Sequence, residues 1–301
     1  MFILFAFCSA MFLGLYDVAK KKSVTDNAVL PVLFLSVLFS TLIFSPFLLD
    51  SQFGLGWFKG ENMAAEPLGL KEHGLVFFKS LIVLTSWICG YFSIKHLPLT
   101  ITSNISATRP MMVLVGAIAI YGEKLNAWQW GGVLLSIVSL YLLSRVSRKE
   151  GYGFKSNKWF FMAVLAAVAG AASGLFDKYV MTQIESPTQL LAWNNLYQTG
   201  TMGLMLLLLW MPKRATTTPF RWSWYIVAIS VMLSLADYFY FSALVEAGSM
   251  ISLVSIVRRS SVVVSFFFGV LIFKERNVKA KLFDLLLIIL GMVLIYLGTA
   301  Y

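Results

Sequence analysis

The sequence has few charged residues, few cysteines and few histidines, and each shortage excludes a class of protein. Only 13% of the 301 residues are charged, whereas a soluble domain carries about a quarter. The two cysteines, Cys8 and Cys89, lie inside apolar runs, so the chain is not an extracellular disulfide scaffold. The two histidines lack metal-ligand spacing, which argues against a zinc enzyme. We therefore expect neither a metal site nor a cofactor.

Hydrophobic side chains dominate what is present. They make up 59% of the chain, and the mean hydropathy is +0.80. This composition indicates a helical membrane protein with several spans. The net charge of +10 would suggest nucleic acid as a partner of a soluble protein. Here it favours cationic loops on one face of a membrane, and we expect no nucleic-acid partner.

Ten apolar segments are long enough to cross a bilayer, which takes about 20 helical residues each. The first does not resemble a signal peptide, because it lacks a basic start and ends in Asp17 and three lysines. The predicted fold class is therefore all-α, a polytopic membrane protein with ten transmembrane helices. The segments cover approximately residues 2–20, 28–49, 74–95, 99–121, 127–145, 158–181, 188–211, 222–245, 249–273 and 280–300.

The chain divides into two related halves, 1–150 and 151–301, at the polar, basic stretch 145–158. Gly-Leu-Tyr-Asp at 14–17 recurs as Gly-Leu-Phe-Asp at 174–177, and Tyr-Phe-Ser at 91–93 recurs at 240–242. Each half holds five segments, an odd number, so the second half must enter the membrane from the opposite side. The pattern predicts an inverted repeat, a transporter plan that places the substrate site between the halves. The small residues Ala6, Ala10 and Gly14, with their counterparts Ala166, Gly170 and Gly174, predict only close helix packing.

Lysine and arginine are unevenly distributed over the two membrane faces. The loops after odd-numbered segments hold sixteen of them, and the other face holds five, Lys79 among them. The positive-inside rule then places the odd loops in the cytoplasm and both termini outside.

Three arginines lie near the middle of segments 4 and 9, namely Arg109, Arg258 and Arg259. Each ionised group at that depth costs about 2.5–3.5 kcal/mol on insertion scales, so it needs a reason. The helical period places serines such as Ser106 and Ser261 beside them, giving two polar stripes that can face one cavity. Because guanidinium binds carboxylate and phosphate bidentately, these arginines are candidates for an anion site.

Three carboxylates offer an alternative role for the arginines. Asp17, Asp177 and Asp237 also lie within segments, so three acids could neutralise three bases. Asp17 and Asp177 lie toward helix ends beside Lys20 and Lys178, which favours interfacial ion pairs over a proton relay. Asp237 lies deeper, and we expect a functional or ion-pairing role for it.

Segment 7 contributes a polar cluster of Trp193, Asn194, Asn195 and Gln198. The cluster indicates a wall of the same cavity, although single amides also serve as contacts between helices. Four aromatic residues could line this space as well, with lipid contact or packing as the alternative, namely Trp87, Tyr91, Tyr238 and Tyr240.

The arrangement resembles the drug/metabolite transporter superfamily, in its EamA-like branch. Gly-Glu-Lys at 122–124 and Lys-Glu-Arg at 274–276 follow segments 4 and 9, and the stretch from Lys95 to Arg109-Pro110 is similar to the family's passage between segments 3 and 4. The resemblance implies a secondary transporter with ten helices, inverted halves, a central cavity and no bound cofactor. It also implies cytoplasmic termini, against the charge count.

Basic residues in segments 4 and 9 look more like the triose-phosphate and nucleotide-sugar translocator branch. In that branch such residues hold the substrate phosphate, which nominates Arg109, Arg258 and Arg259 for an anionic group.

The leading hypothesis is an exporter or exchanger of a small polar metabolite that carries a carboxylate or phosphate. The alternative is an intramembrane enzyme for lipid or isoprenoid phosphates, which the lack of a paired acidic motif or a histidine motif disfavours. We expect no enzymatic activity, a bacterial inner-membrane location, a lipid bilayer and a small molecule as partners, and a homodimer as a possible assembly.

Overall fold

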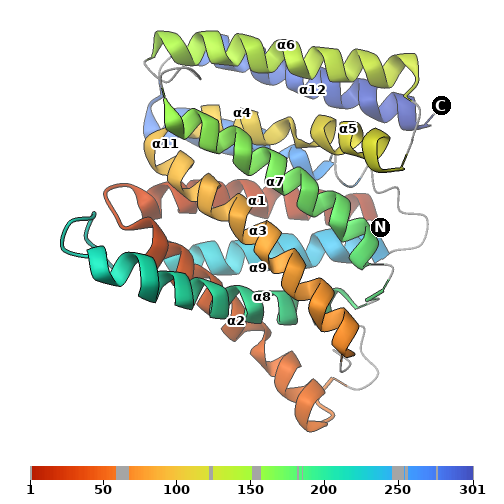
Figure 1. Cartoon of the computed structure of the whole chain (residues 1–301). Helices are drawn as coiled ribbons and strands as arrows, with labels where there is room; N and C mark the ends of the chain where they lie inside the picture. Colours follow the sequence, from red (N-terminus) through yellow and green to blue (C-terminus); the bar gives the residue numbers. More distant parts are fainter. Residues whose placement is uncertain are drawn as a thin grey trace.

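The computed structural model describes residues 2–58, 68–121, 125–150, 157–181, 183–184, 186–245, 254, 257–275 and 277–300. All regular structure within these residues is helical, as predicted. The helices run broadly along one direction and pack as a bundle several layers deep (Figure 1). They are α1 (Phe2–Val24), α2 (Val29–Phe53), α3 (Leu70–His96), α4 (Leu99–Ala107), α5 (Arg109–Tyr121), α6 (Ala127–Lys149), α7 (Lys158–Val180), α8 (Pro187–Met205), the π-helical turn η1 (Leu206–Trp210), the 3₁₀ turn η2 (Met211–Lys213), α9 (Tyr225–Val245), α11 (Ser261–Phe273) and α12 (Val278–Ala300).

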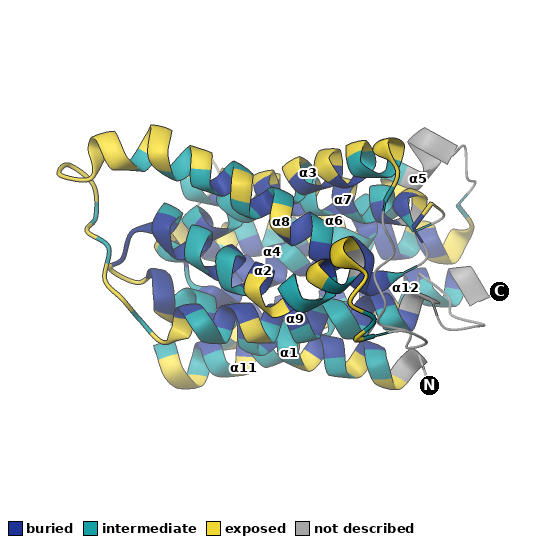
Figure 2. Ribbon diagram, turned by 90° about the horizontal axis from the view of Figure 1, so that it is seen from below, coloured by how far each residue is buried: buried dark blue, intermediate teal, exposed yellow. Residues whose placement is uncertain are grey.

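Six helices of the described part are long and apolar enough to cross a membrane. Large hydrophobic side chains remain exposed along the outward faces of the bundle (Figure 2). Such faces suit contact with lipid rather than water. The six spans are Val29–Asp50, Leu70–His96, Ala127–Lys149, Lys158–Asp177, Tyr225–Ala243 and Val278–Gly298.

The main helix contacts join the first half of the chain to the second. α1 packs on α9, α3 on α7, α2 on α8 and α6 on α12. Counting helices from the start of each half pairs α1 with α7, α2 with α8, α3 with α9 and α6 with α12. If each helix is replaced by its counterpart in the other half, the α1–α9 contact becomes the α3–α7 contact. The α2–α8 and α6–α12 contacts stay the same. This is the contact pattern of two similar units related by a two-fold axis.

The contact between α6 and α12 depends on two glycines. A Cβ atom on Gly132 would lie 2.6 Å from the Gly291 carbonyl oxygen, and one on Gly291 would lie 3.1 Å from the Gly132 carbonyl oxygen. The backbones approach this closely because neither residue has a side chain. The start of α6 is fixed by a capping box, in which Asn126 and Gln129 each bond the other's backbone N–H.

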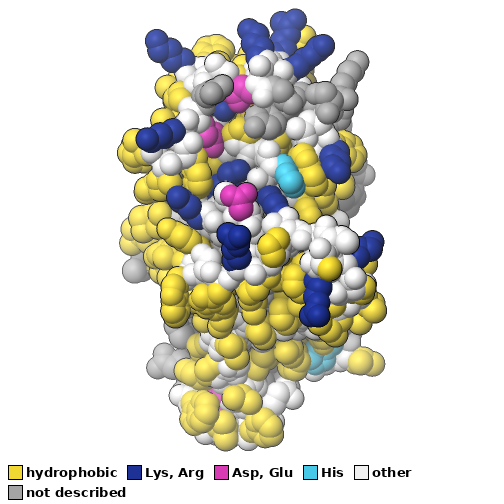
Figure 3. Space-filling model, turned by 90° about the vertical axis from the view of Figure 1, so that its left-hand side faces the viewer, with side chains coloured by type: hydrophobic (Ala, Val, Ile, Leu, Met, Phe, Trp, Pro, Cys, Tyr) yellow, Lys and Arg dark blue, Asp and Glu magenta, His cyan; other side chains and the backbone are white. Residues whose placement is uncertain are grey.

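One end of the bundle holds the last residues of α1, α3, α6, η2 and α11 (Figure 1). Lysine and arginine side chains spread over this end, surrounded by hydrophobic side chains (Figure 3). It is the end at which the sequence count places sixteen lysines and arginines.

Three of the expected segments differ from single straight helices. The segment expected at 99–121 is divided at Thr108 into α4 and α5, and the segment expected at 249–273 is interrupted at Ser260 before α11. The segment expected at 188–211 leaves α-helical geometry after Met205. Gly122, Glu123, Lys124 and Arg276, on which part of the family resemblance depends, lie outside the described residues.

Candidate functional site

The breaks in segments 4 and 9 have the same hydrogen-bond pattern. The Thr108 hydroxyl donates to the Ile105 carbonyl at 2.7 Å, and the Ser260 hydroxyl donates to the Val257 carbonyl at 2.6 Å. The backbone N–H groups of the same two residues donate to the same carbonyls at 3.2 and 3.0 Å. Each break is followed by a helix of 13 residues.

Proline explains the first break and not the second. Pro110 has no N–H to offer the Ser106 carbonyl, and its ring crowds that carbonyl, so the helix cannot continue unchanged. Segment 9 has no proline at this point, and the Ser260 hydroxyl supplies a local alternative bond. Interrupted helices at matching places in the two halves are a feature of transporter binding sites. Arg109 directly follows one break and Arg259 directly precedes the other.

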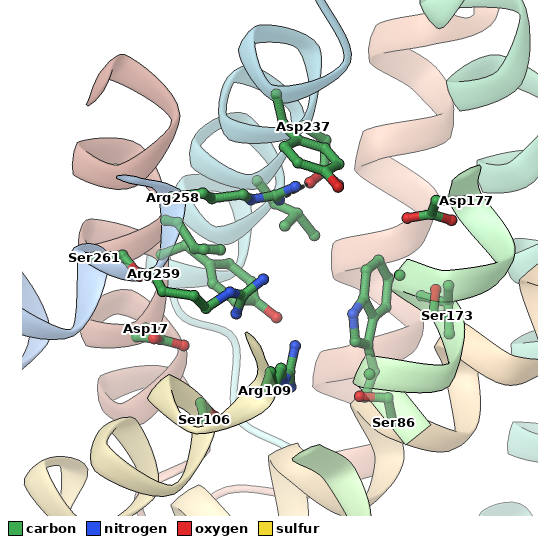
Figure 4. A pocket seen from close by; sticks show the side chains of 18 of the residues that line it. Asp17, Ser86, Ser106, Arg109, Ser173, Asp177, Asp237, Arg258, Arg259 and Ser261 are labelled. Atoms are coloured by element: carbon green, nitrogen blue, oxygen red, sulfur yellow. Dashed lines mark hydrogen bonds and ion pairs between the residues drawn. The ribbon is translucent and has the colours of Figure 1, made fainter. Parts of the chain in front are cut away.

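A cavity of about 170 Å³ lies between the halves at these breaks. Its volume is several times what one water molecule needs. Seven of the residues nominated from the sequence line it (Figure 4). They are Asp17, Arg109, Asp177, Asn194, Asp237, Arg258 and Arg259.

Each cavity carboxylate has one basic partner. Lys20 pairs with Asp17 at 2.9 Å across one turn of α1. Lys79 of α3 pairs with Asp177 of α7. Arg258 pairs with Asp237 of α9. The alternative in which three aspartates neutralise three arginines therefore holds for Arg258 alone. Asp17 forms the expected pair with Lys20, and Asp177 pairs with Lys79.

Arg109 and Arg259 make no ion pair or hydrogen bond with any residue that the structure describes. The Arg109 Nε atom is buried without a partner. Both side chains extend from opposite helices toward the space between α1, α4 and α7 (Figure 4). Arg258 differs from them, because its guanidinium also lies over the Tyr240 ring, 4.0 Å from its centroid.

The described lining has a surplus of positive charge. Five basic side chains and three carboxylates face the cavity, so three pairs leave two guanidinium groups without an acid. Ser103, Ser106, Ser173 and Ser261 add hydroxyl groups that can donate to an anion, whereas the Ser86 hydroxyl donates to the Ala166 carbonyl at 2.7 Å. The arrangement can hold a doubly charged anion through guanidinium and hydroxyl donors.

Gly170 sets the position of the Arg109 guanidinium. A Cβ atom on Gly170 would lie 2.6 Å from Arg109 Cζ and 2.8 Å from its Nε. Gly14 packs on α11, since its Cβ atom would meet Val264. Gly174 also lines the cavity, but its Cβ atom would meet only Val113, at 3.8 Å. The sequence assigned this whole pattern to packing, and the structure adds contact with a cavity arginine at one position.

Five of the nominated residues lie outside the cavity lining. Trp193 packs edge-on against His73, with ring centroids 4.5 Å apart. Tyr91 is buried in the core between α1, α2 and α3, with its hydroxyl 3.4 Å from Ser36 Oγ. The other three are Tyr238, Asn195 and Gln198. Both amide atoms of Gln198 are buried and have no partner within the described residues.

One cavity residue escaped the sequence analysis. Lys79 was counted as a loop charge, yet in the structure it is only 4% exposed. Of the four aromatic residues that the sequence offered for the cavity wall, Trp87 and Tyr240 line the cavity.

The model of the EamA-like transporter family matches residues 1–145 and 157–297. The chain belongs to the EamA-like transporter family. Members of this family are integral membrane proteins, in agreement with the apolar helices of the described part. The two matched stretches meet near the polar connection that divides the sequence in half.

The fold has a counterpart among solved structures. One described only as the crystal structure of a protein superposes with a TM-score of 0.64 at 17% identity, over 99% of this chain and 98% of the other. At this identity the likeness concerns the fold alone. None of the curated proteins compared with this EamA-like chain matches it.

Proposed function

We propose that the chain is a secondary transporter, an exporter or exchanger, of a small anion with carboxylate or phosphate groups. The observation that carries the proposal is the pair of cavity arginines, Arg109 and Arg259, without an acidic partner among the described residues. Asp17 attracts both guanidinium groups but pairs directly with Lys20. Burying two cations without a direct acidic partner is costly, and a doubly charged anion would offset that cost. Guanidinium groups also suit the planar, bidentate recognition of carboxylate and phosphate.

The anion crosses the membrane by alternating access, with the two five-segment halves rocking against each other. Ten transmembrane segments in two inverted halves underlie this motion. The proposal is supported by the contacts that exchange when the halves are exchanged and by the matching breaks at Thr108 and Ser260.

Transport is favoured over chemistry on a lipid phosphate. An intramembrane hydrolase or transferase needs a general base free to take a proton. Each of Asp17, Asp177 and Asp237 is bound by a basic side chain.

The membrane is proposed to be a bacterial inner membrane, with the connections after odd-numbered segments in the cytoplasm and both termini outside. Lys79 and Lys281 are buried and Lys20 is partly buried, and all three lie within helices rather than in loops. Removing them lowers sixteen to fourteen on one face and five to four on the other, so the asymmetry persists. A homodimer stays a prediction.

Cysteine labelling tests this orientation. Thr216→Cys and Gln52→Cys introduce a thiol at exposed positions on opposite ends of the bundle. An impermeant maleimide added to intact cells should label Gln52→Cys only. Labelling of Thr216→Cys only would reverse the orientation without affecting the transport proposal.

A ligand screen tests the substrate class. Purified protein is melted in the presence of phosphorylated metabolites, dicarboxylates, zwitterionic amino acids and cations, because a ligand bound to the folded state raises the melting temperature. We expect stabilisation by doubly charged anions, weakened roughly 10- to 100-fold in affinity by Arg259→Gln or Arg109→Gln. Arg145→Gln, at an exposed site on α6, is the control and should respond like the wild type.

Stabilisation by cations or amino acids alone would contradict the anion site. Equal responses of Arg259→Gln and the wild type would do so as well, and would identify the arginines as structural.

A further inference from the structure

A second buried polar cluster lies away from the cavity, where α12 meets α4 and α6. Its centre is Asp284, which is 1% exposed. The Ser139 hydroxyl of α6 donates to one carboxyl oxygen, and the Asn104 amide of α4 donates to the other at 3.0 Å. Both partners are neutral, so neither offsets the charge of an ionised Asp284.

The nearest base on α12 is Lys281, and it pairs with acids other than Asp284. Lys281 is fully buried and lies 3.0 Å from a Glu150 oxygen and 3.7 Å from a Glu275 oxygen. With Asp284 the cluster holds three carboxylates, against Lys281 and against Lys21 of α1, whose charge acts on Glu275. At least one of these acids therefore lacks a countercharge when all are ionised.

The helices around Asp284 supply no further base. α4 and α11 contain no charged residue. The only charged residue of α5 is Arg109, which faces the cavity beside Gly170. The basic residues of α6, which are Arg145, Arg148 and Lys149, are all exposed.

An unpaired buried carboxylate is costly, and the neutral acid avoids that cost. A neutral carboxyl group also needs an acceptor for its O–H. Asn104 is fully buried, and its Oδ1 has no hydrogen-bond partner among the described residues. The amide that donates to Asp284 therefore also holds a free acceptor, so the pair can bond in both protonation states.

We propose that Asp284 is a proton-binding site that couples proton movement to the position of α4. The proposal rests on the transport function proposed above. α4 is held at two points, by Asn104 at Asp284 and at its first turn by Glu275, which accepts from the N–H groups of Leu99 and Thr100.

The far end of α4 reaches the cavity. Ser103, Ser106 and Ala107 line it, and the break at Thr108 leads directly to Arg109. A proton that binds to Asp284 reverses the direction of donation between Asn104 and the carboxyl group. The change therefore acts on the short helix that presents Arg109 to the anion. Asp284 takes up one proton in one state of the transporter and releases that proton in the other state.

The cavity aspartates are poorer candidates for this role. Asp17 and Asp177 each have a lysine partner that supplies a countercharge. Asp284 differs from both because all of its hydrogen-bond partners are neutral.

The first test needs no substrate. Infrared spectra of the purified protein report the C=O stretch of a protonated carboxyl group. We expect a band that disappears as the pH is raised and that is absent from Asp284→Asn. Asp26→Asn is the control, since Asp26 is exposed and has a positive φ of 53° that asparagine also adopts. Ser139→Ala removes a donor to the carboxylate and should move the midpoint of the band to higher pH, which keeps the test valid if Asp284→Asn does not fold.

The second test uses liposomes and inorganic phosphate as the probe. Wild-type protein should exchange phosphate without a gradient and accumulate it when a pH gradient is applied. Asp284→Asn should keep the exchange and lose at least tenfold of the gradient-driven accumulation.

The outcomes separate the two proposals. Accumulation that persists in Asp284→Asn, or a protonation band that persists in it, overturns the proton site. A sodium gradient that replaces the pH gradient in the wild type also overturns it. Absence of exchange in the wild type, together with no stabilisation by any anion, overturns the transport proposal instead, while the infrared band still decides the state of Asp284.

Discussion

Thr108 and Ser260 form the same pair of hydrogen bonds, each from its hydroxyl and its N–H to the carbonyl three residues earlier. Only the break at Thr108 is caused by a proline, Pro110. The two halves of the chain therefore reach one backbone geometry by different side chains. An arginine adjoins each break, so this geometry delivers Arg109 and Arg259 to the cavity.

Gly170→Ala should impair anion binding more than folding. The added methyl would lie within 2.6 Å of Arg109 Cζ, so the guanidinium must move. We expect the anion-induced rise in melting temperature to fall by at least half. Gly200→Ala, where a Cβ meets nothing within 4 Å, is the helical control and should change little. A full anion response in Gly170→Ala would show that the position of Arg109 does not matter.

Lys79→Met should be strongly destabilising, by about 3–5 kcal/mol, because it leaves Asp177 as an unpaired buried charge. The double variant Lys79→Met/Asp177→Asn should lose less than Lys79→Met alone. Thermal unfolding of the wild type, both single variants and the double variant gives the coupling energy. Additive losses would mean that the two side chains are not paired in the membrane.

Gly132→Ala should destabilise the α6–α12 contact by about 1–3 kcal/mol through overpacking, since its Cβ would clash with the Gly291 carbonyl. The neighbouring Gly131→Ala is a matched control, because its Cβ would lie 3.8 Å from Leu294 Cδ1. Thermal unfolding compares the two. Equal melting temperatures would show that the two backbones are farther apart than described.

Glu275→Ala should loosen the first turn of α4. The carboxylate accepts from Leu99 N and Thr100 N and contacts buried Lys281, so its removal leaves donors and a cation without an acceptor. We expect a loss of about 1–3 kcal/mol, and faster amide hydrogen exchange at 99–102. Exchange that speeds up elsewhere but not there would contradict the capping role.

Much of the cavity could be predicted because charge at membrane depth is rare. Arg109, Arg258, Arg259 and Asp237 stood out against apolar neighbours, and all four line the cavity. The helical fold followed from hydropathy in the same way.

Helix rotation could not be predicted for α8. Asn194 faces the cavity, and its neighbour Asn195 does not. The two amides are chemically identical, so only the packing of α8 on α2 and α3 separates them.

Charges near segment ends were difficult for a related reason. Lys79 was counted as a loop charge because it lies close to the start of its segment, and no role was predicted for Asp284. Their burial depends on neighbouring helices from the other half of the chain, which no local pattern records. The break at Ser260 was equally hidden, since no proline marks it.

The Lys79–Asp177 pair joins residues 98 positions apart, and this separation sets an order of events during biosynthesis. When α3 leaves the ribosome, the acid that neutralises its lysine has not been translated. Arg109 must likewise wait for the helix that carries Gly170. The first half of the nascent chain therefore stays incomplete until α7 has been made, and the two halves expressed as separate polypeptides should each be degraded unless the other is present.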